Sequence, residues 1–328
     1  MVGRDFMSKL RRFLITVGAF FAAALPLSHA VAQNSDGGSG LQISPIRHRL
    51  TMNPGESKTI SIIVKNVTQG KLVAKVGLND FESDGESGEP KILIDTKERT
   101  PNSLEKFITG FADIDLKSNE SKEVKLFLNA PANTPAGAYF GAVRFTAIPE
   151  GANDEDRRVT LNASVASLVL VEISGDITES IQLLSAKATR GKNTGSFFFS
   201  APDQVAVTVK NTGNGFSQPF GRVSVIGMSN KEVHSYELNN KDPRGNILPD
   251  STRIFRDELK NVKSPGRYKI TANISHGSGG QVLTVTTTFW YVPVWLLVTI
   301  LVLLIGLIVL AYAFYRTRLN RQLRRHRR

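Results

Sequence analysis

The sequence predicts an all-β fold of two tandem immunoglobulin-like β-sandwiches, followed by one C-terminal transmembrane helix. Three observations support this prediction. Short runs of alternating polar and apolar residues recur along the chain, turns rich in Asn, Gly and Pro separate these runs, and an uncharged apolar stretch lies close to the C-terminus. The roughly 259 residues between a leader and that stretch suffice for two ordinary domains.

The first half of the body shows the alternation most clearly. In residues 57–65, Ile60, Ile62 and Val64 alternate with polar residues, which is the pattern of a half-buried strand. Further strands are expected at residues 72–78, 123–128, 139–148 and 159–173. Between them, the spacing of Leu104 and Phe107 after Pro101 predicts a short helix or turn over 103–109 that caps the core.

The second half repeats the landmarks of the first. Strands are expected at residues 204–210, 222–226, 267–274 and 282–291. In each half one strand ends on an asparagine, Asn66 or Asn211, and a Pro/Gly turn enters a later strand through Tyr139 or Tyr268. In immunoglobulin-like sandwiches a Tyr at this point often ties an inter-sheet corner. We therefore expect one domain over 41–174 and a second over 175–290, with the boundary near Gly175.

The N-terminus has the pattern of a secretory signal. A basic segment precedes a short apolar one, and Ala30 and Ala32 form a small-x-small cleavage site, so residues 1–32 are predicted to be removed. Residues 33–40 would then be a flexible lead. The start could also be Met7, and an uncleaved N-terminal anchor is the alternative.

The C-terminus predicts one membrane span at residues 291–315, because residues 292–314 carry no charge. The basic tail 316–328 should stay in the cytoplasm, which places the body outside. The residues expected to set this topology are Arg316, Arg318, Arg321, Arg324 and Arg325. The residues expected at the two membrane interfaces are Trp290, Tyr291 and Trp295 outside, and Tyr312 and Tyr315 inside.

The composition excludes several classes of function. The net charge is +12, but the exported part is nearly neutral, with 30 basic and 28 acidic residues. Nucleic acid is therefore not an expected partner. The lipid bilayer is an expected partner, because of the predicted span. The chain has no cysteine. An exported chain of this size without disulfides indicates a bacterial cell surface, since eukaryotic ectodomains usually carry them.

No residue pattern points to catalysis or to a cofactor. His48, His234 and His276 are scattered, without ligand neighbours at metal-site spacing, and no nucleophile elbow is present. We predict no enzyme activity, no cofactor and no small-molecule substrate. The acidic loop 79–89 resembles the start of a calcium-binding loop, but Lys91 stands where a bidentate Glu belongs, so a hairpin tip is favoured over a calcium site.

An aromatic triplet, residues 197–199, has two interpretations. A run of three Phe is typical of a strand buried in the core. The alternative is an exposed patch that contacts a partner.

Short motifs in the first half resemble a known family. The Pro54-Gly55-Glu56 turn before a strand, and the segment 135–143, resemble the peptidoglycan-binding domain of bacterial WxL-interacting surface proteins, which share the order of signal peptide, two sandwiches, one span and basic tail. This resemblance implies binding to the cell wall and to a partner protein. The same turn also resembles the first domain of periplasmic pilus chaperones. There, paired basic residues hold a client's terminal carboxylate, a role that Arg49 could take, although residues 160–171 offer no Lys partner.

Two non-enzymatic hypotheses follow. In the first, a membrane-anchored bacterial surface protein binds cell-wall glycan, a surface protein, or both. In the second, the chain is a membrane-tethered chaperone or assembly factor that pairs a strand with surface proteins at a sheet edge. An exported hydrolase is the third hypothesis, and it lacks a recognisable catalytic set.

Overall fold

A computed structural model describes residues 40–94, 99–149, 164–191, 193–277 and 280–325. The side chains beyond Arg316 are outside this description. The signal segment 1–32, its cleavage residues Ala30 and Ala32, and all of the lead except Gly40 also lie outside the described residues. These assignments therefore stay predictions.

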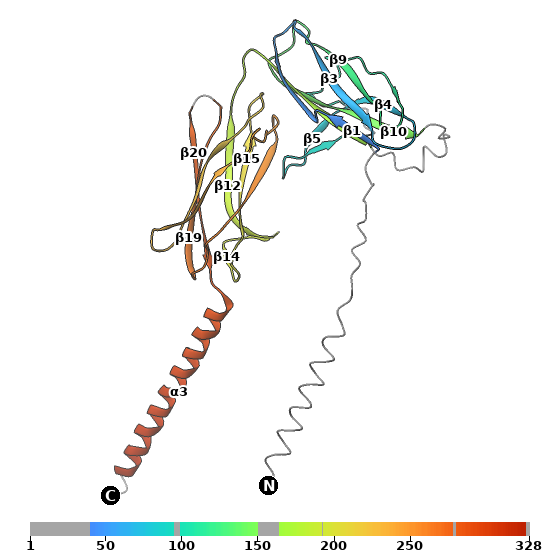
Figure 1. Cartoon of the computed structure of the whole chain (residues 1–328). Helices are drawn as coiled ribbons and strands as arrows, with labels where there is room; N and C mark the ends of the chain where they lie inside the picture. The colour runs from blue at the N-terminus through green and yellow to red at the C-terminus, as the bar shows by residue number, and fades with distance from the viewer. Residues whose placement is uncertain (1–39, 95–98, 150–163, 192, 278–279, 326–328) are drawn as a thin grey trace, which may run out of the picture. The chain divides into compact units, whose positions relative to one another are not determined.

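Residues 41–173 form two facing sheets around one core (Figure 1). The first sheet has the strand order β1-β3-β9-β7, and the second has the order β2-β11-β10-β4-β8. The strands are β1 Leu41–Ser44, β2 Arg47–Met52, β3 Ser57–Asn66, β4 Leu72–Asn79, β7 Ile108–Thr109, β8 Ile114–Leu116, β9 Ser121–Asn129, β10 Gly137–Pro149 and β11 Ser164–Ile173. Ile62, Leu126 and Phe145 are completely buried between the sheets, as the alternation in the sequence requires.

Residues 181–291 form a second pair of sheets, with the orders β13-β12-β15-β18 and β14-β20-β19-β16-β17. The strands are β12 Ile181–Arg190, β13 Asn193–Thr194, β14 Phe197–Phe198, β15 Gln204–Asn211, β16 Phe220–Ile226, β17 Glu232–Leu238, β18 Thr252–Glu258, β19 Gly266–Ser275 and β20 Val282–Tyr291. Val207, Ile270 and Phe289 are buried in its separate core. We call the two pairs the first and second sandwich.

The matched landmarks of the two halves perform the same structural tasks. Asn66 and Asn211 are buried at strand ends, where their side-chain amides donate to the carbonyls of Gly70 at 2.8 Å and Gly215 at 2.8 Å. Each tyrosine hydroxyl donates to the carbonyl four residues earlier, from Tyr139 at 3.1 Å and from Tyr268 at 2.6 Å. The prediction that these tyrosines tie a corner is confirmed.

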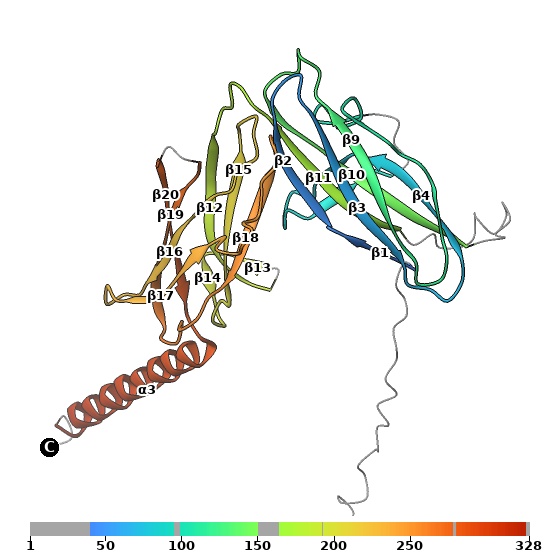
Figure 2. The same cartoon turned by 45° about the horizontal axis from the view of Figure 1, so that its top comes forward.

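The first strands of the body connect both sheets of the first sandwich (Figure 2). β1 pairs with β3 in one sheet, and after Pro45 the chain continues as β2, which pairs in parallel with β11 in the other sheet. Because β2 begins its pairing at Leu168, it covers only the later part of β11. Among the described residues, no strand covers residues 164–167 of β11 on this side.

The segment 103–109 forms turns that lead into β7, and contains no helix, so of the two predicted forms the turn is the one observed. Leu104 and Phe107 do reach the core, with 0% and 9% exposure. Among the described residues, α3 (Val294–Arg325) is the helix long and apolar enough to cross a membrane; its candidate span Val294–Arg316 has 23 residues, and the most apolar 18 of them have a mean hydropathy of 3.2. An all-β body followed by one C-terminal apolar helix is therefore confirmed.

Candidate functional site

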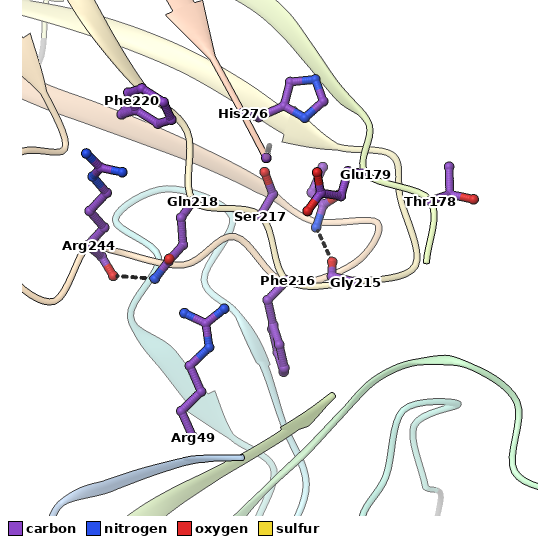
Figure 3. A pocket seen from close by; sticks show the side chains of 12 residues that line it. Arg49, Thr178, Glu179, Gly215, Phe216, Ser217, Gln218, Phe220, Arg244 and His276 are labelled. Atoms are coloured by element: carbon purple, nitrogen blue, oxygen red, sulfur yellow. Dashed lines mark hydrogen bonds between the residues drawn. The ribbon is translucent and has the colours of Figure 1, made fainter. Parts of the chain in front are cut away.

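A cavity of about 230 Å³ lies beside β2, with Arg49 on one side and loops of the second sandwich on the other (Figure 3). Arg49 is exposed, and its side chain projects from β2 toward Phe216 and Gln218. Ser217, Arg244 and His276 also line the cavity. The volume is enough for several water molecules or for one small polar group.

The second basic residue of the cavity is held by packing and by a backbone contact. The Arg244 guanidinium lies 4.3 Å from the centre of the Phe220 ring, a cation–π arrangement. Its backbone carbonyl accepts a hydrogen bond from Gln218 at 3.1 Å. The cavity therefore contains two guanidinium groups, from Arg49 and Arg244, together with Glu179.

Two polar atoms in the wall of the cavity lack hydrogen-bond partners. Among the described residues, neither Ser217 Oγ nor His276 Nδ1 has a partner, and both atoms are buried. Buried polar atoms in native proteins nearly always have a partner, from protein, water or ligand. The wall is therefore suited to an occupant that forms hydrogen bonds, and the arginines favour a negatively charged one.

The loop that carries Ser217 and Gln218 is fixed by Asn211. The side-chain amide of Asn211 donates to the carbonyls of Gly215 at 2.8 Å and Ile247 at 3.0 Å. Ser217 and Ile247 also exchange backbone hydrogen bonds of 3.1 Å and 2.8 Å. The asparagine seen in the sequence as a strand end thus builds one wall of the cavity.

The uncovered edge of β11 lies next to β2. Within the described residues, no strand pairs with residues 164–167 on the side where β2 covers residues 168–173. The Leu168 amide faces this side, because it donates to the Ile46 carbonyl at 2.9 Å. Alternate residues of a strand face the same side, so the Ala166 amide also points to the open edge. Ile46 beside it is 70% exposed.

The acidic loop forms a hairpin tip, as predicted, but it also contacts the second sandwich. β5 (Phe81–Ser83) and β6 (Pro90–Ile92) form the hairpin. The carbonyl of Glu86 accepts from the Ile254 amide at 2.6 Å, and its carboxylate lies 3.4 Å from Arg256. Both partners belong to β18. The loop therefore works as a contact to β18, which the sequence pattern did not show.

Asp84 organises this loop from within. Its carboxylate accepts hydrogen bonds from the backbone amides of Glu86, Ser87 and Gly88 and from the Ser87 hydroxyl. Burial acts to raise the pKa of Asp84, but these hydrogen bonds outweigh it and lower the pKa to about 2. Among the described residues, no three His, Asp or Glu side chains are grouped as a metal site requires.

The residues predicted for the membrane interfaces fall at the junction of β20 and α3 and along α3. Trp290 and Tyr291 end β20, whereas Trp295, Tyr312 and Tyr315 lie on α3 and are 59%, 64% and 64% exposed. Arg316 and the backbones of Arg318, Arg321, Arg324 and Arg325 belong to the same helix. Their roles in topology stay predictions.

The aromatic triplet is divided between the core and the surface, and its contact with a partner stays a prediction. Phe198 is 7% exposed and packs in the core, whereas Phe197 and Phe199 are 67% and 58% exposed.

Comparison with known proteins gives only distant likenesses. No family model matches the chain, and no curated protein matches it. Among solved structures, the class 5 fimbriae chaperone CfaA is 16% identical with a TM-score of 0.38, over 77% of this chain and 100% of that one. The Pseudomonas aeruginosa CupB2 chaperone is 11% identical with a TM-score of 0.31, over 75% and 98%. A chain of the Salmonella enterica complex of SafA pilin with SafB chaperone is 11% identical with a TM-score of 0.32, over 77% and 95%.

These comparisons correct the resemblance drawn from the sequence. The three similar structures named above involve fimbrial chaperones, and no family model supports a WxL-interacting protein, so that prediction is wrong, together with the peptidoglycan binding that it implied. The physical reason is that the motifs were structural. Gly55 has a φ of +82° in the turn between β2 and β3, and Gly137 has a φ of +151° where β10 begins. Turns of this kind serve many sandwiches. At such identities and TM-scores, the likeness assigns no functional residue.

Proposed function

We propose that the protein is a non-enzymatic, membrane-tethered assembly factor that binds an extended segment of an exported surface protein. The segment adds a strand to the open edge of β11. The observation that carries the proposal is this edge: the Ala166 amide points outward with no strand opposite it among the described residues, next to the exposed side chain of Ile46. Unpaired strand edges are templates for pairing with another chain.

The cavity supplies a second contact for the same client. Arg49 pairs in register with Leu170, three residues beyond the last uncovered residue of β11, which corresponds to about 10 Å along the strand. A segment seated on the edge would end within reach of the guanidinium. Arginine binds carboxylates through two parallel hydrogen bonds. We infer that a carboxylate of the client, such as a chain terminus, occupies the cavity, where Ser217 Oγ and His276 Nδ1 would gain partners.

The proposed topology follows the sequence. Two tandem immunoglobulin-like domains, 41–174 and 175–290, lie outside a bacterial membrane, α3 spans the membrane, and the arginine tail remains in the cytoplasm. The roughly 35 Å length of a 23-residue apolar helix supports the span, because a hydrocarbon core is about 30 Å thick. In the Salmonella enterica structure the SafB chaperone is in complex with SafA pilin, and we propose a client of that general kind, a surface protein subunit.

The test uses a photo-crosslinking amino acid placed at Ile46 in the full-length protein in cells. We expect a covalent adduct with an exported protein, and we expect Ala166→Pro to abolish it, because proline removes the outward amide while leaving the hydrogen bonds to β10 in place. Ala166→Val is the matched control, since it keeps the amide and should keep the adduct. Adducts of equal yield in both variants would contradict strand addition.

The cavity is tested in the same assay. Arg49→Gln should reduce the adduct, whereas Arg47→Gln, a change of the same kind on the same exposed side of β2, should not. If both substitutions reduce the adduct equally, the client is held by the overall positive charge of β2 and not by the cavity.

A further inference from the structure

Large apolar side chains are exposed at the end of the second sandwich where β20 stops. Phe197, Phe199, Met228 and Trp290 have exposed fractions of 67%, 58%, 70% and 39%. Met228 and Trp290 line one groove of about 450 Å³. Exposed apolar groups clustered in this way mark an interaction surface more often than single ones do.

The aromatic part of this surface is held by paired strands. β14 lies beside the end of β20, because the Trp290 amide donates to the Ser196 carbonyl at 2.7 Å and the Val292 amide to the Phe198 carbonyl at 2.8 Å. Phe197 stacks on Trp290, with ring centres 6.5 Å apart and an interplanar angle of 6°. The two nearly parallel rings therefore present one continuous apolar face.

Basic side chains lie on the same face of the sheet. Arg267 is the cross-strand partner of Trp290, and Lys269 is the partner of Thr288. Tyr268 and Phe289, the residues between them, are 5% and 1% exposed, so the alternation of the strands turns Arg267 and Lys269 outward. Both are exposed, and neither forms an ion pair within the described part of the chain.

This surface is adjacent to the apolar helix in the chain. Only Val292 and Pro293 separate β20 from α3. Four residues from Trp290 to Val294 span at most about 14 Å, and the polar zone on each side of a bilayer is about 5–8 Å thick. Once α3 crosses the membrane, Trp290 and its neighbours cannot lie far from the headgroups.

We propose that this surface, formed by Phe197, Met228, Arg267, Lys269 and Trp290, is a second membrane contact that binds anionic lipid headgroups. The proposal rests on α3 spanning the bilayer and is independent of what the β11 edge binds. Aromatic side chains favour the interface between water and lipid. Each basic residue near an anionic surface strengthens binding about fivefold. A bilayer suits this combination of exposed rings and two cations, and it is the surface nearest along the chain.

The experiment uses Trp290 as its own reporter. The chain has 2 Trp, so Trp295→Phe leaves Trp290 as the single one. This full-length variant is placed in nanodiscs of brominated phosphatidylcholine, alone or in an equal mixture with phosphatidylglycerol. We expect lipid quenching of Trp290, and protection from aqueous acrylamide, to increase with phosphatidylglycerol. Incorporation into the nanodisc reports separately on α3.

Charge-reversal variants distinguish binding of this surface to anionic headgroups from its mere proximity to the bilayer. Arg267→Glu with Lys269→Glu should remove the increase caused by phosphatidylglycerol, whereas the control pair Lys65→Glu with Lys106→Glu, two exposed lysines of the first sandwich, should keep it. Circular dichroism confirms that the variants are folded. Equal quenching in every lipid and every variant would overturn the proposal. Protection that rises with protein concentration in phosphatidylcholine alone would also overturn it, by identifying a second copy as the occupant.

Discussion

At the scale of single residues, two asparagines hold several loops each. The Asn66 amide reaches the carbonyls of Gly70, Leu116 and Lys117, and its oxygen accepts from the Thr68 amide at 2.8 Å and from the Thr68 hydroxyl at 2.7 Å. The side chain is completely buried. A residue that satisfies so many buried groups cannot be replaced by an apolar one without leaving them unpaired.

We therefore predict that Asn66→Ala lowers the free energy of unfolding by about 2–3 kcal/mol, since buried carbonyls lose their donor. Asn129 is exposed, so Asn129→Ala should lower the free energy of unfolding by less than about 0.5 kcal/mol. Chemical denaturation of the full-length protein in detergent measures both. A cost for Asn66→Ala as small as that of the control would show that water replaces the lost hydrogen bonds.

At the scale of elements, the acidic hairpin depends on the charge of one carboxylate. The pKa of Asp84 is lowered from 3.8 to about 2, so its stabilising effect is complete above pH 4 and is lost as the pH falls through 2. We predict that the wild type has a higher melting temperature than Asp84→Asn at neutral pH, and that the difference disappears between about pH 4 and pH 2. A difference that stays constant over this range would assign the effect to shape rather than charge.

The strands show what could be predicted from the sequence. Strands with regular alternation, such as β3, β15 and β20, were predicted close to their observed bounds. β2 was not, because Arg47–Met52 carries few apolar residues and its place depends on parallel pairing with β11, more than a hundred residues later. Local pattern carries no information about such a distant partner.

The candidate site was even less visible in the sequence. Arg49 was singled out only through the resemblance to pilus chaperones, and Arg244 was not singled out at all. Ser217 and His276 line the cavity because the loop between β15 and β16 and the end of β19 meet there. A site assembled from loops that are distant in sequence leaves no spacing that could reveal it.

At the scale of the whole molecule, a third apolar cluster joins the two sandwiches. Phe81 and Phe140 come from the first sandwich and Phe216 from the second, with ring centres 5.0 Å apart for Phe81–Phe140 and 6.2 Å apart for Phe140–Phe216. All three rings are buried. Because of this cluster and the contact of Glu86 to β18, we expect the unfolding of one sandwich to depend on the other.

We predict that Phe216→Ala weakens the packing between the two sandwiches by about 3 kcal/mol, which is the usual destabilisation for a buried Phe→Ala substitution. Calorimetry should then resolve two unfolding transitions where the wild type has one. Phe127→Ala, at a residue that is 53% exposed, should leave a single transition. A single transition at a lower temperature in Phe216→Ala would mean that the cluster stabilises both sandwiches without coupling them.

The short join between β20 and α3 has a mechanical consequence. In the proposed topology, a pull on the body between a client and the bilayer passes through β20. This strand forms ten cross-strand pairs with β19, from Ser275–Val282 to Gly266–Tyr291. A force along the strand loads all of these pairs together in shear, instead of opening them one at a time. The proposed membrane anchor would thus be joined to a part of the fold that resists tension.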